Sequence, residues 1–194
     1  MSRLEKFIKE RSWLRKPADF LRFFHMAIAN HFVNKIPSYF IRKILYKYFF
    51  FMKIGKNSNL QMGIRVYSPN KIRIGDNCSI GNNSLLDGRR GIEIGDNVDI
   101  AGYVKVLTLG HDLDDSSYKT IGGKVSIKNH ASIFTGASIL PGLIIEEGSV
   151  IALDSVLTKN TESWTIYAGN PAKAIRKRKI NTLTYLHNYK RYFH

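Results

Sequence analysis

A histidine among carboxylates is the group in this sequence best suited to chemistry. His111 is the sole histidine of the polar segment 110–118, which also holds Asp112, Asp114 and Asp115. An imidazole accepts a proton near neutral pH, so His111 suits the work of a general base. The three acids could orient or stabilise that imidazole. The alternative is a solvated turn in which the histidine and the acids are ordinary surface groups.

Metal chemistry has little support in the sequence. The single cysteine, Cys78, excludes an internal disulfide and any multi-cysteine zinc site, and it suits a reducing compartment such as the cytoplasm. Only His111 and His130 lie between residues 32 and 186, too few for a three-histidine zinc site. We interpret His130 as a structural corner residue and predict no metal site.

Aliphatic residues recur at every sixth position through the middle of the chain. They are Ile54, Leu60, Val66, Ile74, Ile80, Leu86, Ile94, Ile100 and Val106, then Ile127, Ile133, Ile139, Ile145, Ile151 and Leu157. This period fits neither a helix nor an alternating strand, but it fits short strands that meet at corners, three to a coil. The pattern predicts an all-β main domain built as a β-solenoid. Gly, Asp and Asn cluster at the expected corners, where we expect the carboxylates to form turns.

One step between successive coils is too long for a regular solenoid. Ile54, Ile74, Ile94, Ile127 and Ile145 are separated by 20, 20, 33 and 18 residues. The long step therefore contains an inserted loop at about 108–124, which holds His111. Because a solenoid leaves little room for variation elsewhere, a polar loop at one corner is an expected functional site.

The charge lies at the two ends of the chain. The sequence carries 30 Lys plus Arg and 15 Asp plus Glu. The surplus is concentrated in residues 1–53 and 173–194, whereas the repeat region is close to neutral. A nucleic-acid reader more often carries its basic stripe on the folded body, so we expect no nucleic-acid partner.

The N-terminal region is basic and rich in aromatic residues. A helix is predicted after Pro37, from a cap at Ser38 to Met52, with an apolar face and a basic side. Such a helix can lie on an anionic membrane, or it can pack on the adjacent domain or another subunit. No apolar run is long enough to span a bilayer, and we expect no secretion signal.

These features resemble the hexapeptide-repeat acyltransferases, and most closely the sugar and surface-polysaccharide O-acetyltransferases, which include galactoside and maltose acetyltransferases. The resemblance covers about residues 54–178 and is carried by residues 98–111 and 167–173. It implies a left-handed parallel β-helix of about five coils with one inserted loop. We expect an α-helical N-terminal region at 1–53, the β-helix domain at 54–172, and a basic C-terminal tail or helix at 173–194.

The resemblance implies an acetyl-CoA-dependent O-acetyltransferase in which His111 occupies the position of the catalytic histidine. His111 would take the hydroxyl proton as the sugar oxygen attacks the thioester. Asp87, Tyr103 and Asp112 are the expected acceptor-binding residues. Asp87 falls one coil below the loop, and its alternative role is a corner carboxylate that caps one of the arginines at 89 and 90. Tyr103 stands where the galactoside and maltose enzymes carry an asparagine.

The resemblance also implies where acetyl-CoA binds. Thr135, Gly136 and Leu153 would line the pantetheine arm. Thr158, Lys159, Lys173 and Arg176 would meet the nucleotide and its phosphates. The alternative for the run 176–179 is a solvated or membrane-facing basic segment.

The expected partners are a sugar or glycan acceptor and two further copies of the chain in a homotrimer. The acceptor would belong to a surface polysaccharide or its lipid-linked precursor, reached from the cytoplasmic side, with peripheral membrane contact through residues 1–53. One alternative is an N-acetyltransferase of a nucleotide-linked amino sugar. Another is a β-helix scaffold without catalysis.

Overall fold

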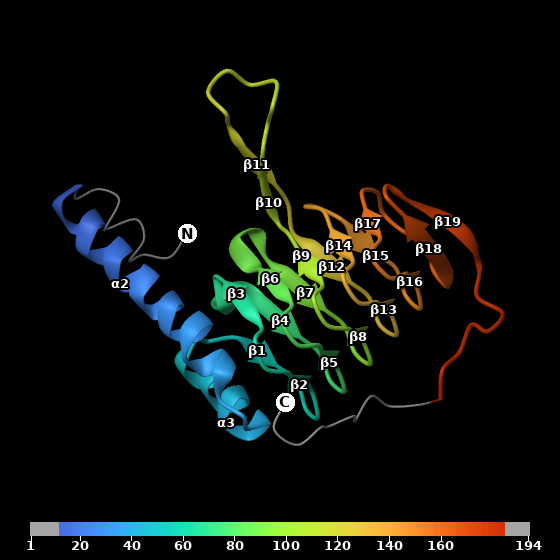
Figure 1. Ribbon diagram of the computed structural model, residues 1–194, viewed down its shortest axis with the longest axis horizontal. Helices are drawn as coiled ribbons and strands as arrows, with labels where there is room; N and C mark the ends of the chain where they lie inside the picture. Colours follow the sequence, from blue (N-terminus) through green and yellow to red (C-terminus); the bar gives the residue numbers. More distant parts are fainter. Residues whose placement is uncertain (1–11, 185–194) are drawn as a thin grey trace.

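The computed structural model describes residues 12–184, in which two helices precede a three-sided β-solenoid (Figure 1). Helix α2 spans Ser12–His31 and α3 spans Tyr39–Ile44, with a 3-10 turn at Val33–Lys35 and a π-helical turn at Leu45–Phe49. Within the described residues, no helix combines the length and the apolar character needed to cross a membrane.

The predicted helix begins at its expected cap but ends early. Ser38 Oγ accepts a hydrogen bond from the Ile41 amide at 3.4 Å, as an N-cap does. The helical segment stops at Phe49 and not at Met52, because Phe51 adopts the left-handed conformation with a φ of 56°. The Met52 amide then donates back to the Tyr46 carbonyl at 2.9 Å, which closes the segment.

Each side of the solenoid is one parallel sheet. The first side comprises β1 (Lys53–Ile54), β4 (Ile72–Ile74), β7 (Ile92–Ile94), β12 (Val125–Ile127) and β15 (Ile144–Ile145). The second comprises β2 (Asn59–Leu60), β5 (Ser79–Ile80), β8 (Asp99–Ile100), β13 (Ser132–Ile133), β16 (Val150–Ile151), β18 (Thr165–Gly169) and, antiparallel, β19 (Ala172–Lys177). The third comprises β3 (Arg65–Tyr67), β6 (Leu85–Asp87), β9 (Lys105–Val106), β14 (Ser138–Ile139) and β17 (Val156–Leu157).

The six-residue period sets the register of these sheets. Ile54 pairs with Ile74, Ile74 with Ile94, Ile94 with Ile127, and Ile127 with Ile145. Each aliphatic column is buried along the solenoid axis, so every coil stacks its apolar residues on the coil before it. Five complete coils form, and β18 begins a sixth.

The corner carboxylates and amides act as turn formers, as predicted. Asp76 Oδ1 accepts the Lys56 amide at 2.6 Å, Asp96 Oδ1 accepts the Asp76 amide at 2.7 Å, and Asn129 Oδ1 accepts the Asp96 amide at 2.9 Å. This ladder satisfies backbone donors that the strands leave unpaired.

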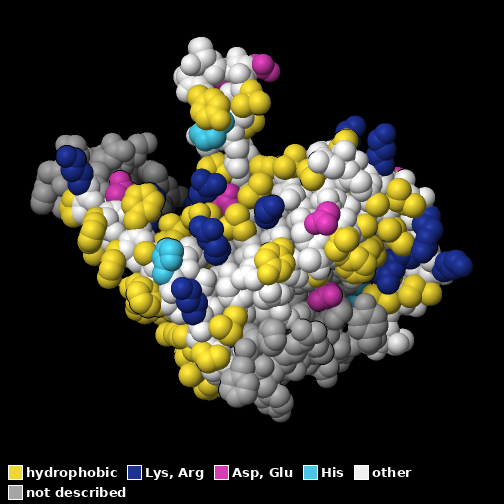
Figure 2. Space-filling model, in the orientation of Figure 1, with side chains coloured by type: hydrophobic (Ala, Val, Ile, Leu, Met, Phe, Trp, Pro, Cys, Tyr) yellow, Lys and Arg dark blue, Asp and Glu magenta, His cyan; other side chains and the backbone are white. Residues whose placement is uncertain are grey.

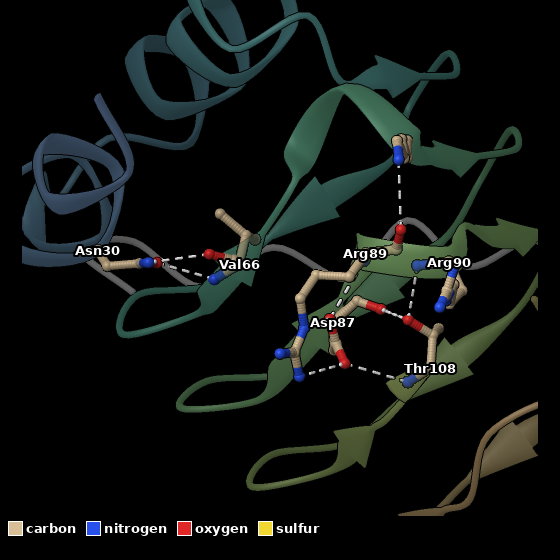
Figure 3. Close-up of polar contacts among 7 residues, drawn as sticks. Asn30, Val66, Asp87, Arg89, Arg90 and Thr108 are labelled. Carbon is tan, nitrogen blue, oxygen red and sulfur yellow. Dashed lines mark hydrogen bonds and ion pairs between the residues drawn. The ribbon is translucent and has the colours of Figure 1, made fainter. Parts of the chain in front are cut away.

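The N-terminal helices close the open end of the first coil. Arg42 is fully buried and donates through Nη2 to the Leu60 carbonyl at 2.8 Å and through Nη1 to the Ile36 carbonyl. On α2, Nδ2 of the Asn30 side chain donates to the Val66 carbonyl at 2.8 Å, and Oδ1 of the same side chain accepts from the Val66 backbone amide at 2.7 Å (Figure 3). Asn30 thus supplies the hydrogen bonds of a missing neighbouring strand on β3.

Two segments leave the regular coil. The insertion forms an antiparallel hairpin of β10 (Leu109–His111) and β11 (Thr120–Gly122), which projects away from the solenoid (Figure 1). After β18 the chain turns back as β19, so residues 172–177 form a strand that pairs with β18 and not a tail or helix. Residues 178–184 form neither helix nor strand, and the last part of the expected C-terminal tail, residues 185–194, lies outside the described residues.

The buried Arg42 provides a test of the N-terminal cap. Arg42→Met removes the guanidinium and leaves two carbonyl oxygens without their donor, so we expect a loss of about 2 kcal/mol of unfolding free energy. For a chain of this length that loss corresponds to a fall in Tm of about 5 °C, measured by circular dichroism. Lys47→Met, at an exposed position of the adjacent π-helical turn, is the control. Equal Tm values for the two variants would contradict the assigned role.

Candidate functional site

The projecting hairpin holds His111 at the end of its first strand. His111 pairs with Thr120 across the hairpin, and the Asp112 amide donates to the Lys119 carbonyl at 2.8 Å. Beyond this point the chain forms tight turns. Asp112 Oδ1 accepts the Asp114 amide at 3.1 Å, and Asp115 Oδ1 accepts from the Ser117 amide at 2.8 Å. The carboxylates therefore shape the hairpin tip.

The imidazole of His111 is oriented by Tyr118. The Nδ1 atom lies 2.9 Å from the Tyr118 carbonyl oxygen, and the two rings stack with centroids 4.2 Å apart and planes 8° from parallel. A carbonyl oxygen only accepts hydrogen bonds, so Nδ1 carries the proton in this contact. The neutral imidazole then keeps its lone pair on Nε2. Because the side chain is exposed, that lone pair is accessible from solvent.

The expected acidic partner of His111 has another role. Asp112 and Asp115 use Oδ1 to hold backbone amides of the turn, and the imidazole bonds instead to Tyr118. The Ser117 hydroxyl and amide, which hydrogen-bond to Asp115, hold the pKa of that carboxyl below its ordinary value. Asp112 therefore helps to shape the loop that carries the histidine.

Asp87 anchors the base of the same hairpin. It is fully buried, and its Oδ1 and Oδ2 accept from Arg89 Nε at 2.8 Å and Arg89 Nη2 at 3.0 Å (Figure 3). Its Oδ2 also accepts the Thr108 amide at 3.2 Å, and its backbone carbonyl accepts the Thr108 hydroxyl at 2.7 Å. Thr108 Oγ1 in turn accepts the Arg90 amide at 2.9 Å. Two roles were expected for Asp87, binding of the acceptor or capping of one of the arginines at 89 and 90. The structure shows the contact with Arg89.

The ionisation of Asp87 follows from these contacts. Burial opposes the charged form, but hydrogen bonds from the Arg89 side chain and from the Arg89 and Thr108 amides outweigh it. The pKa of Asp87 is held below its ordinary value. The same hydrogen bond raises the pKa of Arg89. Both groups are charged at neutral pH, and together they fix the corner from which the hairpin leaves.

Tyr103, Thr135, Gly136 and Leu153 lie on one column of corners, between the second and third sheets. The Gly136 amide donates to the Gly102 carbonyl at 3.1 Å, and the Asp154 amide donates to the Thr135 carbonyl at 3.0 Å. Gly136 has a φ of +76°, and a Cβ there would lie 1.8 Å from Asp154 Oδ1, so the Asp154 carboxylate occupies the space that a side chain at position 136 would need. Tyr103 and Leu153 are 55% and 61% exposed and give this column an apolar surface.

The expected cationic residues lie on two other elements. Thr158 and Lys159 follow β17 at the next corner, the same column of corners from which the hairpin leaves. Lys173 and Arg176 are exposed on β19, paired with Ala168 and Ile166. Two of their basic neighbours are engaged elsewhere: Lys177 pairs with Glu162 at 2.7 Å, and the Arg178 guanidinium lies 5.4 Å from the Trp164 ring.

Within one chain the expected site residues form three groups: one on the corner column that carries the hairpin, one on the corner column between the second and third sheets, and Lys173 with Arg176 on β19. Parallel strands of the third sheet run from the corner column of Thr135 and Leu153 to the corner column of Thr108 and Lys159. His111 therefore lies at the far edge of this sheet from Gly136. Across residues 12–184, no group of three or more His, Cys, Asp or Glu side chains is arranged to hold a metal ion.

Two contributors were not predicted from the sequence. Tyr118 orients His111, and Thr108 connects the hairpin to Asp87. Thr108 has a recognisable signal, since it is the first residue of the insertion. Tyr118 has none beyond its place on the opposite arm of the loop.

Sequence comparisons agree with this fold. Residues 71–103 match the family described as the hexapeptide repeat of succinyl-transferase. A Schizosaccharomyces pombe protein named as an acetyltransferase is 34% identical over 89 residues, 44% of this chain and 43% of its own length. One from Saccharomyces cerevisiae is 38% identical over 116 residues, 55% of this chain and 56% of its own. The chain thus spans about half the length of these curated relatives.

Solved structures extend the likeness to nearly the whole chain. A hexapeptide-repeat-containing acetyltransferase from Vibrio cholerae, complexed with acetyl coenzyme A, has a TM-score of 0.79 and 25% identity over 93% of this chain and all of its own. A maltose O-acetyltransferase from Clostridium difficile has a TM-score of 0.69 and 27% identity over 91% and 90%. AntD, an N-acyltransferase from Bacillus cereus complexed with dTDP and coenzyme A, has a TM-score of 0.62 and 27% identity over 66% and 74%.

These matches confirm the predicted resemblance and the predicted fold class. The chain carries a hexapeptide repeat and has the left-handed β-helix fold of the hexapeptide-repeat acetyltransferases. The names of its relatives agree with the expected acetyltransferase, and two of the structures named above hold acetyl coenzyme A or coenzyme A.

The Asp87 network predicts a pH dependence of stability. A carboxyl whose pKa is lower in the folded protein than in the unfolded chain stabilises the fold at pH values above its unfolded pKa of about 4. That stabilisation is lost as the pH falls through the folded pKa. Asp87→Asn should therefore lower Tm at pH 7 by several degrees, and the deficit should shrink between pH 4.5 and pH 3. Thermal melts across this range measure it, with the exposed Asp114→Asn as control. A deficit that stays constant with pH would contradict an ionised Asp87.

Proposed function

We propose that the protein is an acetyl-CoA-dependent O-acetyltransferase whose acceptor is a sugar hydroxyl of a surface polysaccharide or its lipid-linked precursor. The observation that carries this proposal is the exposed His111, held by Tyr118 in the tautomer that leaves Nε2 free. The named activities of the similar solved structures support the same class of reaction.

His111 acts as the general base. Nε2 accepts the proton of the acceptor hydroxyl as its oxygen attacks the thioester carbonyl of acetyl-CoA. The new C–O ester bond forms, the C–S bond breaks, and coenzyme A leaves as the thiol after taking a proton. The Tyr118 carbonyl stabilises the imidazolium, because the protonated ring still donates from Nδ1.

The corner column between the second and third sheets holds the pantetheine arm of the donor. The exposed apolar side chains of Tyr103 and Leu153, with the backbone of Thr135 and Gly136, suit the pantetheine arm. Thr158, Lys159, Lys173 and Arg176 supply donors and positive charge for the nucleotide and its phosphates.

The complete site lies between copies of the chain in a homotrimer. His111 and Gly136 are on opposite edges of the third sheet, so one chain does not bring the base to its own donor column. A hairpin that projects away from its own solenoid is suited to reach a neighbour (Figure 1).

The proposal includes peripheral contact with the cytoplasmic face of the membrane through residues 1–53. Buried Ala29, Tyr46 and Phe50 pack on the domain, whereas Phe20, Leu21, Phe24, Phe40 and Tyr48 are exposed. Lys47 is also exposed, and its Nζ lies 5.6 Å from the centre of the Tyr48 ring. An exposed aromatic surface with lysines suits the headgroup layer of an anionic bilayer.

A second candidate is N-acetylation of a nucleotide-linked amino sugar. It is favoured by the likeness to AntD, an N-acyltransferase that was crystallised with dTDP. The same base and donor column serve either acceptor. Transfer to a free nucleotide-linked amino sugar, with none to glycan hydroxyls, would favour this alternative.

His111 is the direct test of the chemistry. His111→Gln should lower kcat by about a hundredfold or more, because general-base catalysis contributes about 10²–10⁴-fold. Release of coenzyme A thiol in the presence of acceptor measures the rate, and circular dichroism checks the fold. Leu113→Ala, at the exposed hairpin tip, is the control. Near-normal kcat in the folded His111→Gln protein would exclude this residue as the base.

The donor site has a separate test. The double variant Lys159→Ala/Lys173→Ala should weaken acetyl-CoA binding by about tenfold or more, because each lysine meets a phosphate. Isothermal titration of the full chain measures this, beside the exposed Lys56→Ala/Lys128→Ala pair as a charge-matched control. Absence of acetyl-CoA binding to the unmodified protein would sink the acetyltransferase proposal itself.

A further inference from the structure

A cleft lies between α2 and the third sheet, outside the residues assigned above to catalysis and donor binding. It has a volume of about 460 Å³, within the usual range of small-molecule sites of about 300–1,000 Å³. Its walls include Arg22, Phe23, Arg65, Tyr67 and Arg89. Figure 2 shows basic side chains gathered on this face, between α2 and the base of the hairpin.

The first wall of the cleft is fixed in place. Asn30 clamps α2 to β3 through two hydrogen bonds with the Val66 backbone (Figure 3). Arg22 projects from α2, with its guanidinium 4.9 Å from the centre of the Phe23 ring. The helix therefore presents a cation and an aromatic ring at a set distance from the sheet.

The opposite wall is also preorganised. Asp87 holds Nε and Nη2 of Arg89, while the guanidinium lies 5.4 Å from the Tyr67 ring. No described residue bonds to Nη1 of Arg89, which leaves that group for a ligand. An arginine fixed in this way loses little side-chain freedom on binding, which strengthens recognition of an oxyanion.

The cleft is cationic without a carboxylate of its own. Arg22, Arg65 and Arg89 line it with His31, and no acidic residue is among its lining groups. Asp19 and Asp87 neutralise two of the arginines from outside the lining, at 3.4 and 2.8 Å. Arg65 is exposed on β3 and has no ion pair with a described residue. A net positive charge therefore remains, and guanidinium groups match the oxygens of phosphate.

The cleft is mechanically joined to the catalytic hairpin. Asp87, which holds Arg89 in the cleft wall, also accepts the Thr108 amide at the start of the insertion. Thr108 is three residues from His111. A ligand bound to Arg89 thus contacts the same hydrogen-bonded corner that sets the base of the hairpin.

We propose that this cleft binds the phosphate or diphosphate of a glycosyl phosphate, so that the acceptor is a sugar carried on a phosphate group. The guanidinium groups of Arg22, Arg65 and Arg89 hold the phosphate oxygens, and the Phe23 and Tyr67 rings pack on the apolar face of the sugar. This assignment deepens the proposed acetyltransferase and, as an acceptor assignment, rests on it. The chemistry is shared by nucleotide-linked and polyprenyl-linked sugars.

The test is isothermal titration of the full chain with inorganic pyrophosphate and with UDP-glucose, in saturating coenzyme A to fill the donor site. Arg65→Gln and Arg22→Gln should each weaken both ligands by about tenfold or more, since each removes a charge-assisted contact. Lys56→Gln makes the same charge change at the exposed corner between β1 and β2, and we expect it to leave affinity within about twofold. Thermal melts confirm that all variants fold.

Two results would overturn the cleft assignment. One is an unmodified protein that binds neither pyrophosphate nor a sugar diphosphate, and the other is binding that survives both arginine substitutions. A glucose linked to a short polyprenyl diphosphate, added in micelles, identifies the source: tighter binding than UDP-glucose, still dependent on Arg65, marks a lipid-linked acceptor. Acetyl-CoA binding is titrated in separate samples of the same proteins without coenzyme A, so failure of the donor site is recognised separately.

Discussion

Hydrogen bonding between successive coils is the constraint on which the whole structure depends. Each short strand satisfies its backbone groups only on the strands above and below, as Ile74 does between Ile54 and Ile94. The inward residue must then be aliphatic at every sixth position, and the chain has freedom only at the corners. The same constraint leaves the first coil with an open edge. Arg42 and Asn30 cover that edge with hydrogen bonds from the N-terminal helices.

The proposed catalytic site lies at a corner, where this constraint is weakest. The insertion leaves at a corner, and its departure is fixed by Asp87, a buried carboxylate that joins Arg89 to Thr108. From that corner the hairpin carries His111 outward, with Tyr118 opposite it to set the tautomer. The solenoid thus fixes the position of the hairpin, and a few polar contacts at one corner orient the proposed base. The arginine cleft beside this corner uses the same Asp87.

Features with a period or a spacing were predictable from the sequence. The aliphatic columns, the coil register and the position of the insertion follow from the six-residue repeat, and the corner carboxylates follow from their turn chemistry. Contacts that no repeat or spacing in the sequence encodes were not predictable. The pairing of Asn30 with Val66 joins residues 36 apart, and the stacking of His111 on Tyr118 depends on the hairpin register. The return of residues 172–177 as a strand depends on the unpaired edge of β18, which composition does not reveal.

The central claim is that Tyr118 holds His111 with its proton on Nδ1, which leaves Nε2 as the base. A long-range ¹H–¹⁵N correlation spectrum of the histidine-labelled protein at pH 8 reports the tautomer, with His111→Gln used to assign the signal. The account predicts the Nδ1–H tautomer for His111. A spectrum with the proton on Nε2, or with rapid exchange between the two tautomers, would contradict it.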